Sequence, residues 1–216
     1  MEEDRGRSAE RLITFVDAVV AIAVTLLALP LADIPGEVAS RGGGLDRILE
    51  EGALPLGAFA LSFFVIARLW WGHHRIFAHV VRWDAVVVWT TIVWLFTIVL
   101  LAPATALTRQ LDPDPGPPDP YANAGAVAIY IGVMAASSWL LTALARHVQR
   151  TPSLTDGHDT EAGDRLFNSV ETSISFTIAL VVGTAVPAIN YFALLSLVVT
   201  GQIGRLLRRR RHRRAR

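Results

Sequence analysis

Two acidic residues lie inside long apolar stretches of this 216-residue chain. Asp17 interrupts the first stretch, residues 12–31, and Glu171 lies early in a later one. By membrane-insertion scales an aspartate at mid-helix costs about 2.5 to 3.5 kcal/mol, so such a side chain is normally paired or functional. We expect Asp17 to turn toward neighbouring helices and to pair with Arg11 or a histidine. For Glu171 we expect a basic neighbour near the cytoplasmic face.

The first apolar stretch also carries four side chains at helical spacing, which are Ala18, Ile22, Thr25 and Leu29. At about 100° per residue they form a stripe about 60° wide, centred roughly 110° from Asp17. The stripe and the carboxylate therefore lie on different faces. Isoleucine and leucine stripes are ordinary in membrane helices, where they meet lipid or another helix. Composition alone leaves the role of this stripe open.

Histidines and arginines are concentrated in residues 68–84, as in a cytoplasmic connection between two membrane helices. His74 and His79 are five residues apart and so do not share one helix face, and no carboxylate stands beside them. A membrane-embedded metal enzyme is therefore disfavoured, and we predict no metal site. The chain has no cysteine, which excludes disulfides and thiolate metal sites.

The elements that position these residues follow from hydropathy. The chain is 52% hydrophobic with a mean hydropathy of +0.43, which is high for a soluble globular protein. Residues 85–107, 122–145 and 172–204 contain no formal charge. Because about 20 apolar residues span the hydrocarbon core, each of these stretches can cross a bilayer. The fold class that this predicts is an all-α integral membrane protein.

We predict six transmembrane helices in one channel-forming domain, residues 1–207. As a single helix, residues 172–204 would reach about 50 Å, which is too long for one span, and Pro187 supplies a break. The first helix is expected to end near Pro30, and residues 33–52 to form a loop with room for a short surface helix. The predicted helices comprise residues 10–31, 54–71, 85–107, 122–145, 166–186 and 188–207.

Charge predicts the orientation of the helices. Arginines precede the first helix, follow the second and fourth, and fill the basic tail, residues 208–216. The positive-inside rule places all of these segments, and hence both termini, in the cytoplasm. Residues 112–120, rich in proline and carboxylates, are expected outside. The tail should meet anionic lipid headgroups rather than nucleic acid, and Trp70, Trp71 and Trp83 should lie at the same interface.

The first helix also carries a recognisable motif. Arg11, Phe15 and Asp17 form a pattern that resembles Arg-x-x-x-Phe-Ser-Asp, the signature of the transmembrane protein 175 family of potassium-permeable channels. Val16 replaces the serine, so any hydrogen bond of that hydroxyl is lost. Further positions that resemble the family are Trp70, His73, His74, Phe77 and Thr105, whereas Thr91 stands where many relatives carry asparagine.

The resemblance implies a pore lined by the first helix of each subunit, with a hydrophobic constriction at Ile22. In this interpretation Leu29 adds a second layer, Ala18 lines the same path, and the Thr25 hydroxyl transiently meets a permeating monovalent cation. The chain contains no Thr-Val-Gly-Tyr-Gly string, so a filter of backbone carbonyls is not expected. We expect K⁺ as the permeating ion and no cofactor.

One first helix cannot enclose a pore, so several copies must assemble around an axis. The resemblance implies a homotetramer in a bacterial plasma membrane. Five residues are expected to form a polar cluster that supports the first helix, namely Arg11, Phe15, Asp17, His73 and His74. A pH-sensing role for the histidines stays a lesser alternative.

The main alternative function is a secondary transporter that uses Asp17 or Glu171 as an ion site on an interrupted helix. Many transporters contain inverted repeats, and no internal repeat is visible in this chain. The sequence therefore favours a channel, which is not an enzyme.

Overall fold

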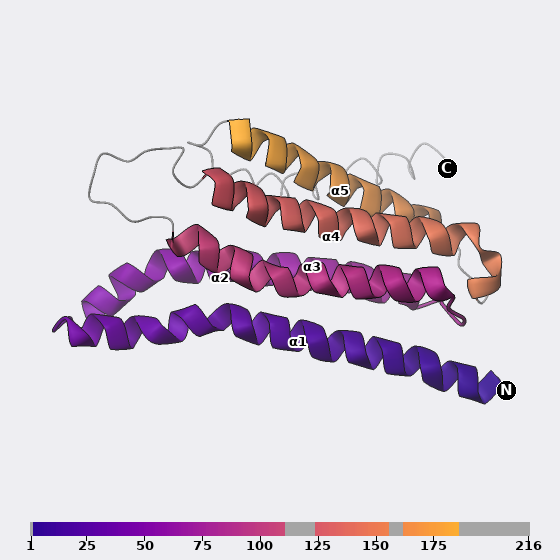
Figure 1. Ribbon diagram of the computed structural model, residues 1–216, viewed down its shortest axis with the longest axis horizontal. Helices are drawn as coiled ribbons and strands as arrows, with labels where there is room; N and C mark the ends of the chain where they lie inside the picture. Colours follow the sequence, from indigo (N-terminus) through magenta and orange to yellow (C-terminus); the bar gives the residue numbers. More distant parts are fainter. Residues whose placement is uncertain (1, 111–123, 156–161, 186–216) are drawn as a thin grey trace, which may run out of the picture.

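The computed structural model describes residues 2–110, 124–155 and 162–185, and in these residues the regular elements are all helical. The α-helices lie roughly along the long axis of the molecule (Figure 1). In chain order they are α1 (Glu2–Ser40), α2 (Leu45–Phe77), α3 (Ala85–Gln110), α4 (Ala124–Arg150), the 3₁₀ turn η1 (Pro152–Leu154) and α5 (Ala162–Ala185).

The helices form a bundle in which α1 lies at one side and α5 at the other (Figure 1). α1 packs on α2 and α3, α3 packs on α4, and α4 packs on α5. The core where α2, α3 and α4 meet is apolar, and its fully buried side chains include Ile66, Trp94, Ile98, Ile131 and Met134. The described residues therefore bury this core and leave apolar side chains exposed on α1 and α5.

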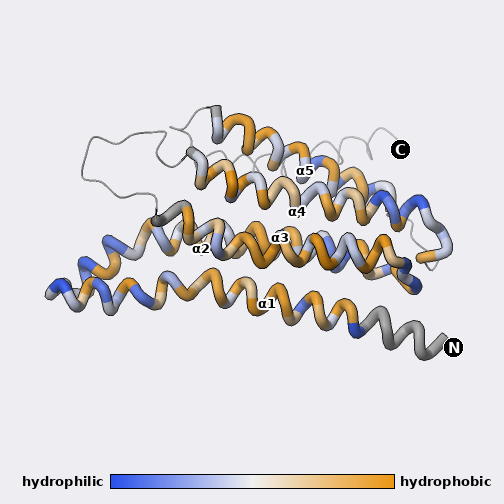
Figure 2. The backbone as a smooth tube through the Cα atoms, viewed as in Figure 1, coloured by the Kyte–Doolittle hydropathy of each residue, from blue (hydrophilic) through white to orange (hydrophobic). Residues whose placement is uncertain are grey.

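Hydropathy along the helices matches a membrane environment, since apolar residues fill their middles and polar residues gather at their ends (Figure 2). Within the part of the chain that the structure describes, five helices are long and apolar enough to cross a membrane. Their candidate spans are Arg11–Ser40, Leu45–Phe77, Ala85–Leu107, Gly125–Arg150 and Ala162–Thr184. The all-α, multi-pass class is thus confirmed. The predicted sixth helix, residues 188–207, the loop 112–120 and the tail 208–216 lie outside the described residues.

The predicted end of the first helix and the predicted loop 33–52 are wrong. α1 continues through Pro30 and Pro35 to Ser40, and α2 begins at Leu45. A proline removes one backbone hydrogen bond, but its fixed φ remains compatible with a helix, and the neighbouring α2 supports the continuation. The connection shrinks to residues 41–44, where Gly42 has a φ of 71°, a conformation that glycine adopts without strain.

The second helix is also longer than the predicted residues 54–71, because α2 runs to Phe77. His73 and His74 are therefore helical residues and not part of a connection. The connection itself is residues 78–84, and it is fastened to the segment after α4. The backbone N–H groups of Val81 and Arg82 donate to the carbonyl oxygen of Leu154 at 2.9 and 3.2 Å.

Asp84 fixes the start of α3. Its Oδ1 accepts a hydrogen bond of 2.9 Å from the backbone N–H of Val87, and its Oδ2 lies 2.8 Å from Nε2 of His147 on α4. A carboxylate in this position satisfies an N–H that has no partner within the helix. α4 reaches Arg150, five residues beyond its predicted end, so that His147 can make this contact.

Candidate functional site

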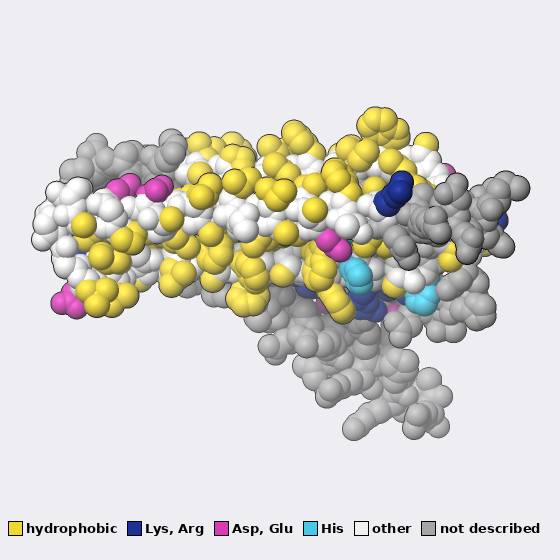
Figure 3. Space-filling model, turned by 90° about the horizontal axis from the view of Figure 1, so that it is seen from below, with side chains coloured by type: hydrophobic (Ala, Val, Ile, Leu, Met, Phe, Trp, Pro, Cys, Tyr) yellow, Lys and Arg dark blue, Asp and Glu magenta, His cyan; other side chains and the backbone are white. Residues whose placement is uncertain are grey.

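The two faces of α1 differ sharply in burial. Val16, Val20, Ala23 and Leu27 are buried where α1 packs against the bundle. Ile22 and Leu29 are each 57% exposed, and Ala18 and Thr25 are exposed as well. The four residues of the predicted stripe thus share the face that points away from the bundle. Figure 3, seen from below Figure 1, shows extensive apolar surface along this side of the molecule.

Thr25 has a defined hydroxyl orientation on this face. Its Oγ1 donates a hydrogen bond of 2.8 Å to the carbonyl oxygen of Ile22, one turn earlier in the helix. The hydroxyl proton of Thr25 is therefore donated within α1. Because a hydroxyl oxygen keeps its acceptor lone pairs when it donates, Oγ1 can still face a cation.

Asp17 is bound, as expected, but not by the residues that we expected. Its Oδ1 accepts a hydrogen bond of 2.7 Å from the indole Nε1 of Trp70 on α2. The prediction of Arg11 or a histidine as partner is wrong among the described residues. Arg11 and Phe15 are instead exposed, with Phe15 exposed at 54%. The Trp70 indole, expected at the membrane interface, serves as the donor.

The two adjacent histidines point in different directions. His73 is only 2% exposed and stacks with Trp94 on α3 at 4.6 Å between ring centroids and with Phe77 at 4.4 Å. His74 is exposed and stacks on Trp71 at 5.9 Å. The predicted cluster is therefore divided. Asp17 reaches His74 only through Trp70, whose ring centroid lies 5.7 Å from that of His74.

Hydroxyl groups join the helices inside the bundle. The Oγ of Ser62 on α2 lies 2.6 Å from the Tyr130 hydroxyl on α4 and 3.5 Å from Oγ1 of Thr105 on α3. Ser173 on α5 lies 2.9 Å from both Ser138 and Thr142 on α4. Such bonds fix neighbouring membrane helices, because lipid offers no alternative partner. These contacts were not predicted, since serine and threonine give no periodic signal of their own.

Glu171 lies near another polar contact between helices. Arg68 on α2 donates from Nη2 to Oγ1 of Thr172, the residue after Glu171, at 2.9 Å. This bond brings a basic side chain to the residue after Glu171, and the expected basic partner of Glu171 itself stays a prediction. Among the described residues no group of three or more histidine, aspartate or glutamate side chains is arranged to hold a metal ion.

Membrane-length helices, a buried network of hydroxyls and an exposed apolar face on α1 define a multi-pass α-helical membrane protein. The family model for the endosomal/lysosomal potassium channel TMEM175 matches residues 11–102. A potassium channel of Streptomyces collinus is 33% identical over 147 residues, which cover 68% of this chain and 67% of that protein. A potassium channel of Chamaesiphon minutus is 28% identical over 198 residues, which cover 86% and 94%.

The fold agrees with these relatives. The crystal structure of a lysosomal potassium-selective channel TMEM175 homolog from Chamaesiphon minutus matches 91% of this chain and 97% of its own, with a TM-score of 0.71 and 22% identity. The chain belongs to the TMEM175 family. Because this is a family of channels, the chain is not an enzyme and no cofactor is expected.

Proposed function

We propose that this chain is a potassium-permeable channel whose pore is lined by the α1 helices of several copies. The observation that carries the proposal is the exposed stripe of Ala18, Ile22, Thr25 and Leu29 on a helix whose opposite face is buried. Two relatives are named as potassium channels, which indicates K⁺ as the permeating ion. A second copy would cover the stripe partly, while a central axis would leave it facing water.

Ile22 is the proposed constriction. A ring of its apolar side chains closes the path by excluding water, which prevents a hydrated cation from passing. Leu29 lies seven residues further and repeats the apolar barrier about 10 Å outward. Between them, Oγ1 of Thr25 offers an oxygen that partly replaces lost hydration of K⁺. Ala18 leaves the inner side of the constriction wide, because its side chain is a single methyl group.

The complete assembly in this proposal is a homotetramer with six membrane helices per subunit. Both termini then lie in the cytoplasm, with the basic tail, residues 208–216, against anionic lipid headgroups of a bacterial plasma membrane. Trp70 and Asp17 hold α1 against α2 on a different face of α1 from the one that meets the axis. An enclosed pore requires more than one copy, since each chain supplies one α1 helix.

The test is passive K⁺ flux from liposomes that contain the purified protein, comparing wild type with Ile22→Asn. An asparagine ring admits water, so we expect flux to rise about tenfold, which corresponds to about 1.4 kcal/mol of the barrier. Ile178→Asn on α5 is the matched control, because Ile178 is 52% exposed but lies on a different helix, and it should leave the flux unchanged.

The transporter alternative predicts a different result. K⁺ movement would then require a proton or sodium gradient and would stop when Asp17 or Glu171 is replaced. Gradient-dependent uptake of this kind, with no passive flux in wild type or in Ile22→Asn, would refute the channel.

A further inference from the structure

The exposed face of α1 continues beyond Leu29 and ends in a charge. Asp33 follows Ile22 by 11 residues, which places it about 20° from Ile22 around an ideal helix. Asp33 is exposed, as the stripe residues are. Its carboxylate follows Leu29 by one turn, or about 6 Å along the axis. The pore-facing stripe of the proposed channel is therefore extended by one acidic residue at its outer end.

Pro30 and Pro35 do not rotate this face out of register. The buried side of α1 continues from Leu27 to Val38, which is only 1% exposed. Ile34 also turns toward α2, since its Cγ2 lies 4.0 Å from the position that a Cβ on Gly52 would occupy. The buried positions of α1 therefore continue at helical spacing across both prolines. Asp33 accordingly lies on the face of α1 that points away from the bundle.

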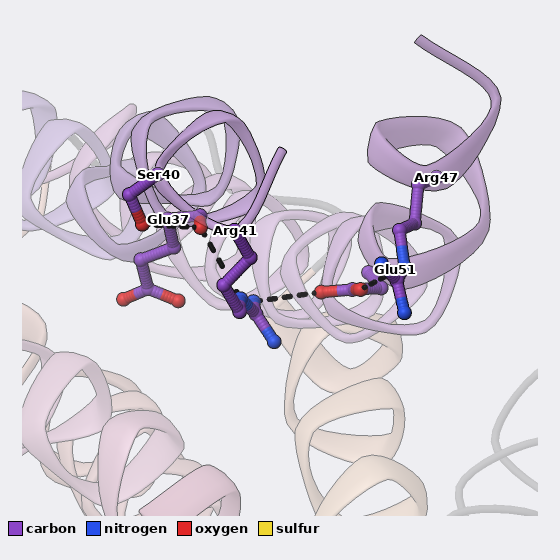
Figure 4. Close-up of polar contacts among 5 residues, drawn as sticks. All are labelled: Glu37, Ser40, Arg41, Arg47 and Glu51. Carbon is purple, nitrogen blue, oxygen red and sulfur yellow. Dashed lines mark hydrogen bonds and ion pairs between the residues drawn. The ribbon is translucent and has the colours of Figure 1, made fainter. Parts of the chain in front are cut away.

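The arginines of the α1–α2 hairpin do not neutralise Asp33. Glu51 forms ion pairs with both Arg41 and Arg47, at 3.0 and 3.4 Å (Figure 4). The Glu37 carboxylate points away from the Arg41–Glu51 pair in the same view. Residues 33–52 contain five acidic and two basic side chains, a net charge of −3. The end of the molecule formed by residues 33–52 is therefore acidic. Asp33 is the acidic residue of this segment that continues the stripe.

We propose that Asp33 sets the local concentration of cations at the outer mouth of the pore. The inference rests on the proposed function, because only an assembly around an axis turns one carboxylate per chain into a ring. Charged rings and clefts of one sign raise the local concentration of the opposite ion through their field, without an ion-binding site. Asp33 thereby increases conductance, while Ile22 controls whether the path is open.

Conductance of single channels in planar bilayers tests this role, with Asp33→Asn compared with wild type in potassium chloride. Screening extends over about 30 Å at 0.01 M salt but only about 3 Å at 1 M. We expect Asp33→Asn to lower the conductance about threefold at the low concentration and to match wild type at the high one. Asp33→Glu keeps the charge and should restore the wild-type conductance.

Asp46→Asn is the matched control, because it removes the same charge from the exposed first turn of α2, away from the stripe. At the low concentration it should lower the conductance less than Asp33→Asn does, and at the high concentration it should match wild type. Equal conductance of wild type and Asp33→Asn at low salt, or an equal loss in Asp46→Asn, would overturn the role of Asp33 alone. Absence of K⁺ conductance in wild type and in Ile22→Asn would instead refute the proposed function.

Discussion

At the residue scale, one indole N–H links α1 to α2. Trp70 donates to Asp17, and both side chains are half-buried. The sequence predicted correctly that a carboxylate in an apolar helix needs a partner. It did not predict which one, because arginine, histidine and tryptophan all carry donors, and the choice depends on the rotation of α1 against α2. That rotation is a property of the packed structure.

Replacing Trp70 by phenylalanine removes the donor and keeps an aromatic ring. The Asp17 carboxyl group then loses its hydrogen bond in an environment with little water, and we expect a loss of about 1 to 3 kcal/mol in stability. Thermal unfolding of the detergent-solubilised protein measures this change. Trp71→Phe is the control, because Trp71 is exposed and should matter little. Equal stability of Trp70→Phe and Trp71→Phe would contradict the importance of the bond.

The existence of the five described helices could be predicted from the sequence, but where α1 ends and where α2 begins and ends could not. Runs of about 20 apolar residues indicate membrane helices by length alone. Residues 33–52 looked like a loop because they contain glycines, a proline and charges, yet all but residues 41–44 are helical. Contacts of α1 with α2 and the pairs made by Glu51 stabilise these ends. Such long-range contacts have no local sequence signal.

The start of α3 gives a prediction at the element scale. The backbone N–H of Val87 and then the bond with His147 hold the pKa of Asp84 below its ordinary value. A lowered pKa in the folded state means that the ionised carboxylate stabilises the fold above its ordinary pKa, near 3.8. This stabilisation is lost as the pH falls through the lowered value.

Asp84→Ala should therefore lower stability at pH 7 by about 1 kcal/mol, through the loss of a helix cap. The difference in stability between Asp84→Ala and wild type should become smaller when the pH is lowered below the ordinary pKa of the carboxyl group. Thermal unfolding followed by circular dichroism over this pH range is the measurement. Asp46→Ala, which removes an exposed carboxylate from the first turn of α2, should be nearly neutral. A difference between Asp84→Ala and wild type that is constant with pH would contradict the assignment.

At the scale of the whole molecule, the described residues cover α1 on one face only. Among the described residues, α2, α3 and α4 meet in a buried core, whereas α1 keeps large apolar side chains exposed along one face. The helical period predicted which residues share that face. It could not tell whether lipid, another helix or a water-filled axis lies opposite, because this depends on copies of the chain that a single sequence does not describe. The proposal that a water-filled axis lies opposite this face comes from the family resemblance.

The claim that this face lines the pore can be tested directly because the chain has no cysteine. A single cysteine at Leu29, on the outer side of the constriction, should react with a cationic methanethiosulfonate reagent added from outside, and the attached charge should abolish K⁺ flux. A cysteine at Ile178 on α5, similarly exposed in one copy, should leave the flux intact. Unchanged flux after complete modification of Leu29→Cys, or an equal block through Ile178→Cys, would contradict a pore lined by α1.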